Sequence, residues 1–515
     1  MPGSVKKFEW RRYFLSIMLF CSVIASGAQE MQSVGVAKYS GINGISLNPS
    51  LPVLSPLYLD INLVSTNVFV QNNYLYIFSN EDKLSRLIKN DVRTLNSSNK
   101  FYSDKYTPGL KHGLVDVSVM GPSVALMFGR HSVGLYTGLR SVTSFKQLPY
   151  TLAKFFYEGL YFPPQYDMTF NYPDKITFGS MHWGEIGLNY SGIIFQEYDQ
   201  TVSIGLTIKQ LLGYAGSYVT MEHLSYRVPN YDTLIVYNTD MEAGLSAPLD
   251  YNGNSFNSSL IRGKGTGLDF GITYEKKVQN GKTNTHVSKL CAQSYTPYLF
   301  RIGAAVTDLG SIRFTSNSMK LKVSDGSLFW PGISGLQFGN VNTMTAELSN
   351  RFFGDPQKLI VDDKFSMSLP ATINLHADVN LTGIILNNTN SSLTYNMNKR
   401  QVNRFLGHGE WFVSGVVIMP LTTSHTTIST SSVISAATRY ETRYFQAGIS
   451  ANLWNYDTFM MGANLRIGYF FIGTDDLLSY MKIKDYTGTN IYAGVKFNLA
   501  KGSCKSSGFS CPDIF

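Results

Sequence analysis

The side chains of this chain that could carry out acid–base chemistry are few and scattered. The eight histidines are His112, His131, His182, His223, His286, His376, His408 and His425. The best candidate among them is His376, which would share one face of a strand with Asp378, because side chains two positions apart point the same way. A barrel enzyme builds a nucleophilic site from a histidine and groups on neighbouring strands. We interpret His376 instead as a hydrogen-bonded histidine inside the fold, and we predict no catalytic residue.

Motifs for enzyme, cofactor or metal chemistry are missing. The sequence has no GxSxG elbow, no HExxH, no Walker A loop and no paired CxxC. Its four cysteines are Cys21, Cys291, Cys504 and Cys511. The last two either form a local disulfide or stay free thiols, and the tail around them lacks the histidines and cysteines of a zinc site. We therefore expect no enzyme activity, no cofactor and no metal.

The N-terminus has the pattern of a secretory signal peptide. Four basic residues precede an apolar run from Phe14 to Ala25, and small residues follow at Ser26 and Ala28. This pattern predicts a signal peptide over residues 1–28 that is removed before Gln29. The run is too short to span a bilayer as a helix, and no later run approaches the required length. Once exported, such a chain can be held in a membrane only as a closed β-barrel.

The composition fits a membrane barrel better than a soluble domain. Charged residues make up 15% of the chain and aromatic residues 13%, whereas soluble domains have about 25% charged residues. The formal net charge of +8 includes four bases and one acid of the signal peptide, so the mature chain is mildly basic. No cluster of lysine and arginine interleaved with aromatics indicates a nucleic-acid surface.

Strict alternation of apolar and polar residues recurs along the chain. It is clearest from Ile373 to Leu381, and each run is about ten residues long, enough to cross a bilayer when tilted. The runs lie at 57–63, 115–128, 131–141, 183–195, 200–212, 266–276, 298–308, 373–381, 410–420, 443–454, 459–472 and 490–499, with weaker ones at 217–228 and 431–440. This predicts an all-β transmembrane antiparallel barrel of about 14 strands, within 12–16. A soluble sandwich would show the same alternation with its faces reversed, so the signal peptide and the number of strands decide for the barrel.

The polar face of these runs carries charges of both signs. On the parity expected to point into the lumen are Asp60, Asp116, Arg140, Glu185, Lys209, Asp269, Glu275, Arg301, Asp378, Arg466 and Lys496. Six acids and five bases favour a lumen of paired charges and plug contacts, because a wide ion-selective pore would have an excess of one sign.

The mature chain is longer than a bare barrel needs. We predict a plug-like segment over residues 29–56, a barrel over 57–500 and a C-terminal tail over 501–515. The surplus falls in insertions at 79–113, 145–182, 229–264 and 313–363, some with short helices. Short turns near Gly129 and Tyr198 alternate with long loops up to the fifth strand. The alternation then loses phase, so at least one later strand prediction must be wrong.

One long loop contains an apolar stripe at helical spacing, made of Leu148, Leu152, Phe155, Phe156 and Leu160. Two interpretations are open. The barrel rim or a neighbouring loop covers the stripe, or the stripe forms a groove for a hydrophobic ligand or a partner.

An ordered set of segments resembles a known family. LNPSLP, GPSVALMFGRHSVGLYTGLRS, VTDLGSIRF, LPATINLHADVN, RYETRYF, FIGTDDLL and CPDIF are similar to a Bacteroidota outer-membrane family catalogued only as a domain of unknown function. That family resembles the FadL-like transporters of hydrophobic compounds, which are 14-stranded barrels with an N-terminal plug. Many of these carry Asn-Pro-Ala near the start, and here Asn48 and Pro49 are followed by Ser50.

The resemblance implies a location and two candidate functions. The chain is expected in the outer membrane, in contact with its lipid and with the barrel-assembly machinery, and its oligomeric state is left open. The first function is passage of hydrophobic small molecules through a plugged lumen. The alternative is a structural or interaction barrel without transport, accessory to secretion or surface assembly.

Overall fold

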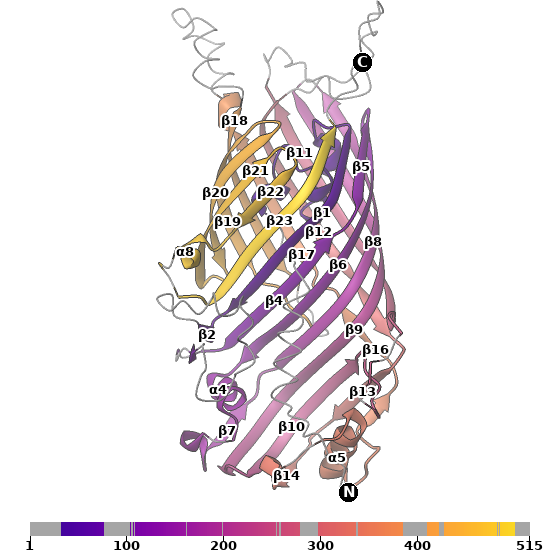
Figure 1. Ribbon diagram of the computed structural model, residues 1–515, viewed down its shortest axis with the longest axis vertical. Helices are drawn as coiled ribbons and strands as arrows, with labels where there is room; N and C mark the ends of the chain where they lie inside the picture. The colour runs from indigo at the N-terminus through magenta and orange to yellow at the C-terminus, as the bar shows by residue number, and fades with distance from the viewer. Residues whose placement is uncertain are drawn as a thin grey trace, which may run out of the picture.

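The computed structural model describes residues 32–76, 103–104, 107, 109–160, 162–197, 199–253, 255–256, 259–278, 297–335, 338–384, 409–421, 427–481, 483 and 485–499. The described chain forms a closed antiparallel barrel of 14 strands (Figure 1). Hydrogen bonds between the first strand β1 (Leu59–Asn72) and the last strand β23 (Gly488–Leu499) close it. The predicted fold class is confirmed. The predicted signal peptide, the C-terminal tail and Cys291, Cys504 and Cys511 lie outside the described residues.

The wall follows chain order around the barrel. After β1 it consists of β4 (Lys111–Met120) continued by β5 (Ser123–Phe128), β6 (His131–Leu148), β8 (Ile176–Glu197), β9 (Gln200–Asn230), β11 (Gly263–Lys277), β12 (Tyr298–Phe314), β16 (Phe365–Ser368) continued by β17 (Thr372–Asn380), β18 (Glu410–Pro420), β19 (Val433–Glu441), β20 (Phe445–Trp454), β21 (Thr458–Ile467) and β22 (Phe470–Thr474).

Alternation along the wall separates two environments. In β17, Asn374 and Asp378 are fully buried on the lumen side, whereas Leu375 is 40% exposed on the outside. Apolar side chains exposed on the outer surface include Leu135, Ile186, Leu188, Ile208, Phe270, Ile302, Ile449 and Ile472. Exposed aromatic side chains near the short turns include Phe128, Tyr190, Trp411, Phe445 and Tyr469. An apolar band edged by aromatic residues is the surface that a bilayer covers on such barrels.

No helix among the described residues is both long enough and apolar enough to cross a membrane.

Two strand predictions are wrong. One counts a single strand twice and the other counts two strands as one, so the predicted number of strands is unchanged. The run 217–228 is the second half of the 31-residue strand β9, which pairs first with β11 and then with the outer strand β10 (Thr233–Ser246). The run 459–472 is two strands, β21 and β22, joined by a turn in which Gly468 has a φ of 60°. Tyr469 and Phe471 continue the apolar parity of Ile467 through the turn, so in the sequence the hairpin looks like one continuous alternation.

The two ends of the barrel differ. The end that contains the tight connections 129–130, 442–444 and 468–469 is called the turn end below, and the end that carries α4, α5 and β10 is called the loop end (Figure 1). At the loop end β7 (Thr169–Tyr172), β10, β13 (Ser318–Val323), β14 (Leu328–Pro331), β15 (Ile360–Asp362), α4 (Tyr150–Glu158) and α5 (Val341–Phe353) form an outer lobe. Smaller elements are β2 (Leu75–Tyr76), β3 (Ser103–Asp104), η4 (Pro163–Gln165), η5 (Ile333–Gly335) and α8 (Leu477–Tyr480).

The N-terminal segment folds inside the barrel. It contains α2 (Gln32–Gly35), η1 (Gly41–Ser46) and η2 (Pro52–Leu54), and from Val34 to Leu57 only Ser46 is exposed. We call residues 34–57 the plug. Its Val36, Leu47 and Leu51 join a buried apolar cluster contributed by wall strands, so the main core of the molecule lies within the lumen.

Candidate functional site

The plug is fastened to the wall through Asn48 and its neighbours. The Asn48 amide donates to the carbonyl oxygen of Ile272 at 3.1 Å and lies 3.1 Å from Nε2 of His376. Ser50 Oγ and Thr273 Oγ1 are 2.7 Å apart. Each of these partners is a wall residue on β11 or β17, so the Asn-Pro-Ser turn closes the lumen by direct polar contact.

Glycines in the wall make room for this turn. A Cβ on Gly205 would lie 2.1 Å from the carbonyl oxygen of Pro49, and one on Gly271 would lie 2.0 Å from Asn48 Oδ1. Real Cβ atoms do not approach so closely, so the wall needs glycine at both positions. The fit of plug to wall therefore depends on residues of both: Asn48 and Pro49 in the plug, and the two glycines in the wall.

His376 and Asp378 have separate hydrogen-bond partners. His376 faces Asn48 of the plug, while Asp378 accepts hydrogen bonds from Tyr298 and from Arg439, the latter at 2.6 Å. Both side chains thus serve the closure of the barrel. In the part of the chain that the structure describes, no group of three or more His, Cys, Asp or Glu is arranged to hold a metal ion.

The eleven predicted lumen charges all lie on the inner face of the wall. Arg140 is partly buried and the other ten are buried. They fall into separate groups. Toward the turn end, Lys496 pairs with Asp60 at 3.0 Å and donates to the plug carbonyl oxygen of Tyr39, and Arg301 pairs with Glu275 at 2.9 Å.

A further turn-end group joins wall and plug. Arg439 binds Asp378 at 2.6 Å and Glu441 at 3.2 Å, and Arg466 lies 3.6 Å from Glu441. Glu441 also accepts from the backbone N–H of Lys38 in the plug. Arg439 and Glu441 are absent from the predicted set because the run 431–440 is a weak alternation that ends before Glu441, whereas β19 includes both residues. Its alternation places both on the lumen face.

The remaining lumen charges gather in the middle of the barrel. Lys209 binds Asp269 at 2.8 Å and Asp308 at 2.6 Å, and Arg140 binds Asp308 at 2.5 Å. Asp308 is absent from the predicted set because strict alternation places it outside. The register between β11 and β12 shifts here and Asp308 has a φ of 59°, so the irregularity turns both Thr307 and Asp308 inward.

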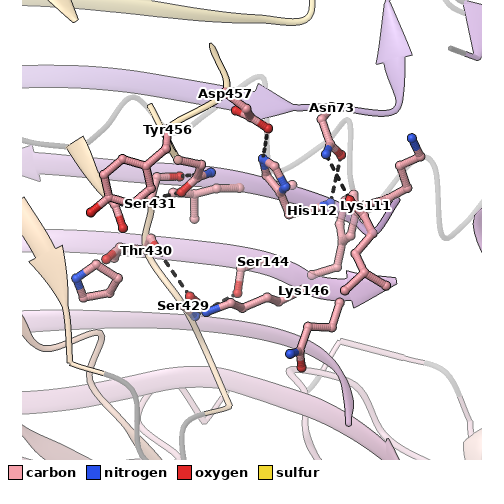
Figure 2. A pocket seen from close by; sticks show the side chains of 18 residues that line it. Asn73, Lys111, His112, Ser144, Lys146, Ser429, Thr430, Ser431, Tyr456 and Asp457 are labelled. Atoms are coloured by element: carbon pink, nitrogen blue, oxygen red, sulfur yellow. Dashed lines mark hydrogen bonds and ion pairs between the residues drawn. The ribbon is translucent and has the colours of Figure 1, made fainter. Parts of the chain in front are cut away.

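Two cavities lie in series along the lumen. The inner cavity, of about 110 Å³, is bounded by Ile45 and Ser46 of the plug and contains the mid-barrel charges. The outer cavity, of about 390 Å³, opens at the loop end between the ends of β1, β4 and β6, loop 429–432 and turn 455–457 (Figure 2). Thr430 lines both cavities. The two cavities therefore have a residue of the same loop in common.

The loop that carries Thr430 is held inside the barrel. Ile428 is fully buried in the same apolar cluster as the plug, and the backbone N–H of Ser429 donates to Ser144 Oγ at 3.0 Å. We call residues 427–432 the inner loop. Figure 2 also shows His112 facing Asp457, with 3.7 Å between Nε2 and Oδ2, at the mouth of the outer cavity. The plug and the inner loop thus both pack inside the barrel, where they share one buried apolar cluster.

The apolar stripe around α4 packs mainly against the outer lobe. Leu148 and Leu152 are buried, and Phe155 and Leu160 are partly buried in a cluster that includes Tyr226. Phe156 is 56% exposed. On the same helix, partial burial lowers the pKa of Lys154, but its Nζ lies 3.0 Å from a carboxylate oxygen of Asp104 and 3.2 Å from one of Glu158. These carboxylates outweigh the burial and raise the pKa. Strands of the outer lobe and the loop-end part of β9 therefore cover four of the five stripe residues.

Solved structures offer remote likenesses to the barrel. The chain is similar to the Ralstonia pickettii toluene transporter TbuX at 9% identity and a TM-score of 0.36, over 92% of this chain and 99% of that chain. For the deltaS2 mutant of the TodX monoaromatic hydrocarbon channel the values are 9%, 0.37, 90% and 95%. For a Pseudomonas aeruginosa FadL homologue they are 7%, 0.22, 92% and 100%. Likenesses this remote transfer no activity.

Comparison with curated proteins gave no match. A family profile described as "Family of unknown function (DUF5723)" matches residues 49–475, which begin in the plug at Pro49 and run through the wall to the end of β22. The match covers well over half of the chain and includes Pro49 and Ser50 of the plug turn, the mid-barrel charges and the inner loop. The chain therefore belongs to the family of unknown function DUF5723.

Proposed function

We propose that this chain is an outer-membrane barrel, exported through its N-terminal signal peptide, that passes small, largely apolar molecules along its lumen. The observation that carries the proposal is the pair of cavities in series that share Thr430. The outer cavity, which opens at the loop end, would admit the molecule. The inner cavity, which is bounded by the plug, would hold it next.

The interior between these stations suits apolar cargo. Leu114 lines the outer cavity and belongs to the buried apolar cluster, and Ile418 belongs to that cluster and lines the inner cavity. The cluster continues to Leu47 and Leu51 of the plug. A water-filled porin has a polar interior instead. Passage then requires that the inner loop and the plug move aside, because both are packed in the resting barrel.

A disulfide that ties the plug to the wall tests this requirement. Ser50 and Thr273 are close enough for a Ser50→Cys, Thr273→Cys pair, introduced into a chain whose native cysteines are replaced by serine. In proteoliposomes, uptake of a fluorescent apolar probe should be low in the oxidised protein and should rise at least several-fold after reduction. The matched control is Thr143→Cys with Ser180→Cys, whose hydroxyl oxygens are 2.8 Å apart on the paired strands β6 and β8. Its uptake should not depend on the redox state.

A second function, an interaction barrel without transport, is favoured by a different observation. The plug and the inner loop both fill part of the lumen, and the outer lobe, which includes β10, β13, β14 and α5, has an apolar core of its own. If reduced and oxidised plug variants take up the probe equally, and no faster than protein-free liposomes, the transport proposal is wrong and this second function stands.

A further inference from the structure

The inner cavity has more buried carboxylates than cations. Four carboxylates and two basic groups line it: Asp116, Glu185, Asp269, Asp308, Arg140 and Lys209. The two basic groups are already engaged, because Lys209 binds Asp269 and Asp308, and Arg140 binds Asp308. Two acids are left over.

The surplus acids face the cavity with unused hydrogen-bonding capacity. Asp116 is 1% exposed, and its Oδ1 has no hydrogen-bond partner in the described chain. Glu185 is 7% exposed, and the indole N–H of Trp183 approaches it at 3.4 Å. Neither forms an ion pair with a described residue. A buried carboxylate without a direct ion pair is unfavourable, so the site favours a bound group that brings positive charge and hydrogen-bond donors.

The shape and lining of the cavity narrow the choice of that group. Met120, Tyr136 and Ile418 give it apolar walls beside the acids. Its volume of about 110 Å³ is somewhat below the roughly 150 Å³ of an apolar cavity that takes benzene. A primary ammonium group has three donors to share between two carboxylates, and a short alkyl chain fills the rest.

We propose that the inner cavity binds the ammonium head of a small alkylamine. This inference rests on the proposed function and makes it more specific, because it names amphipathic amines as the cargo for which the inner station is built. The binding residues are Asp116 and Glu185, and the paired cations Arg140 and Lys209 hold the other two acids away from the ligand.

The test uses the full-length barrel in detergent micelles and three probes of one size: butylamine, 1-butanol and butyrate. Calorimetric titration at pH 7 should show butylammonium binding at least tenfold more tightly than butanol and butyrate. Asp116→Asn, and independently Glu185→Gln, should weaken the amine at least tenfold and leave butanol unchanged. Glu242→Gln, in the outer lobe on β10, is the control that should change neither. Retention of the heat-modifiable electrophoretic band shows that each variant is folded.

Several results would overturn the inference. Equal binding of amine and alcohol to the native barrel would show that the cavity takes a neutral polar group, and no binding of either would show that it takes neither. Unchanged amine affinity in both acid variants would place the amine elsewhere. None of these outcomes affects the plug-disulfide experiment, which measures flux of an uncharged probe. The proposed function is contradicted by a different result, namely equal uptake of the uncharged probe by the oxidised and the reduced plug variant.

Discussion

At the scale of single residues, the plug turn fits against the wall only because glycines leave space for it. Asn48 makes polar contacts with the backbone of Ile272 and with Thr273 and His376, and Gly271 leaves the space in which its amide lies. Each neutral hydrogen bond of this kind contributes about 1 kcal/mol. Replacing a wall glycine by alanine, which adds one methyl group, should therefore weaken the contact between plug and wall.

We predict that Gly271→Ala unseats the plug. The new methyl group would lie 2.0 Å from Asn48 Oδ1, and β11 cannot yield because it is hydrogen-bonded on both sides. Roughly 3 kcal/mol of plug contacts should be lost, on the basis of about 1 kcal/mol for each of three hydrogen bonds. Single-channel conductance in planar bilayers should rise. The control is Gly415→Ala on β18, whose nearest neighbour would be 3.8 Å away, and it should conduct like the native barrel. Equal conductance in both variants would contradict the prediction.

The sequence permitted most of the lumen charges to be placed but not their grouping. Alternation identified Lys209 and Asp269 as inward, since it depends only on parity along one strand. It could not identify Asp308, because a bulge breaks parity there and nothing in the local sequence marks it. It also could not show which acids share a base, because pairing depends on register between strands that are distant in sequence.

At the scale of elements, the outer lobe contains helices that the barrel does not need. Helix α4 begins after Pro149, and Leu152 and Ala153 are buried in an apolar cluster with Tyr226 and Trp330. The cluster joins α4, β10 and β14 of the outer lobe to the loop-end portions of the wall strands β6, β8 and β9. We expect a defect in this cluster to loosen the lobe before it reaches the strands on the far side of the wall.

We predict that Leu152→Ala destabilises α4 locally. Truncation of a buried leucine costs about 2–5 kcal/mol, and most of it should appear as faster amide hydrogen exchange in α4 and β7. The strands β18 to β23 should keep their protection, and the heat-modifiable band should persist. Phe156→Ala is the control, because Phe156 is 56% exposed and its removal creates no cavity. Loss of the whole barrel in Leu152→Ala, or an equal effect in Phe156→Ala, would show that lobe and wall unfold as one unit.

Strand positions followed from the sequence, but strand boundaries did not. Local alternation is insensitive to whether a strand continues beyond the membrane, as β9 does, or reverses at a two-residue turn, as between β21 and β22. The predicted total of 14 is correct because the extra strand predicted within β9 offsets the single strand predicted in place of β21 and β22. The helical stripe at Leu148 to Leu160 was visible from its spacing, whereas its cover came from β9, β10 and β14, which no local pattern connects to it.

At the scale of the whole molecule, closure of the sheet decides which face is inside. Alternation gives two faces and cannot say which one meets water. The structure places the polar face in the lumen, where plug and charges satisfy one another, and leaves the apolar face outside. The signal peptide pattern pointed to this arrangement indirectly, because an exported chain has no other way of holding such strands in a membrane.

The apolar outer surface should have two distinct environments, lipid around the wall and water around the lobe. Ile186 is 47% exposed midway along β8 between His182 and Tyr190, and Phe329 is 62% exposed on the lobe strand β14. We predict that Ile186→Arg lowers the free energy of unfolding in lipid vesicles by about 2–4 kcal/mol, the cost of an arginine at the midplane of a bilayer. Phe329→Arg should change it by less than about 0.5 kcal/mol, as for an ordinary surface substitution. Reversible denaturant titration followed by tryptophan fluorescence measures both. Because the two residues are similarly exposed in the protein itself, only the surrounding medium can separate them, and equal losses would mean that the band around β8 does not face lipid.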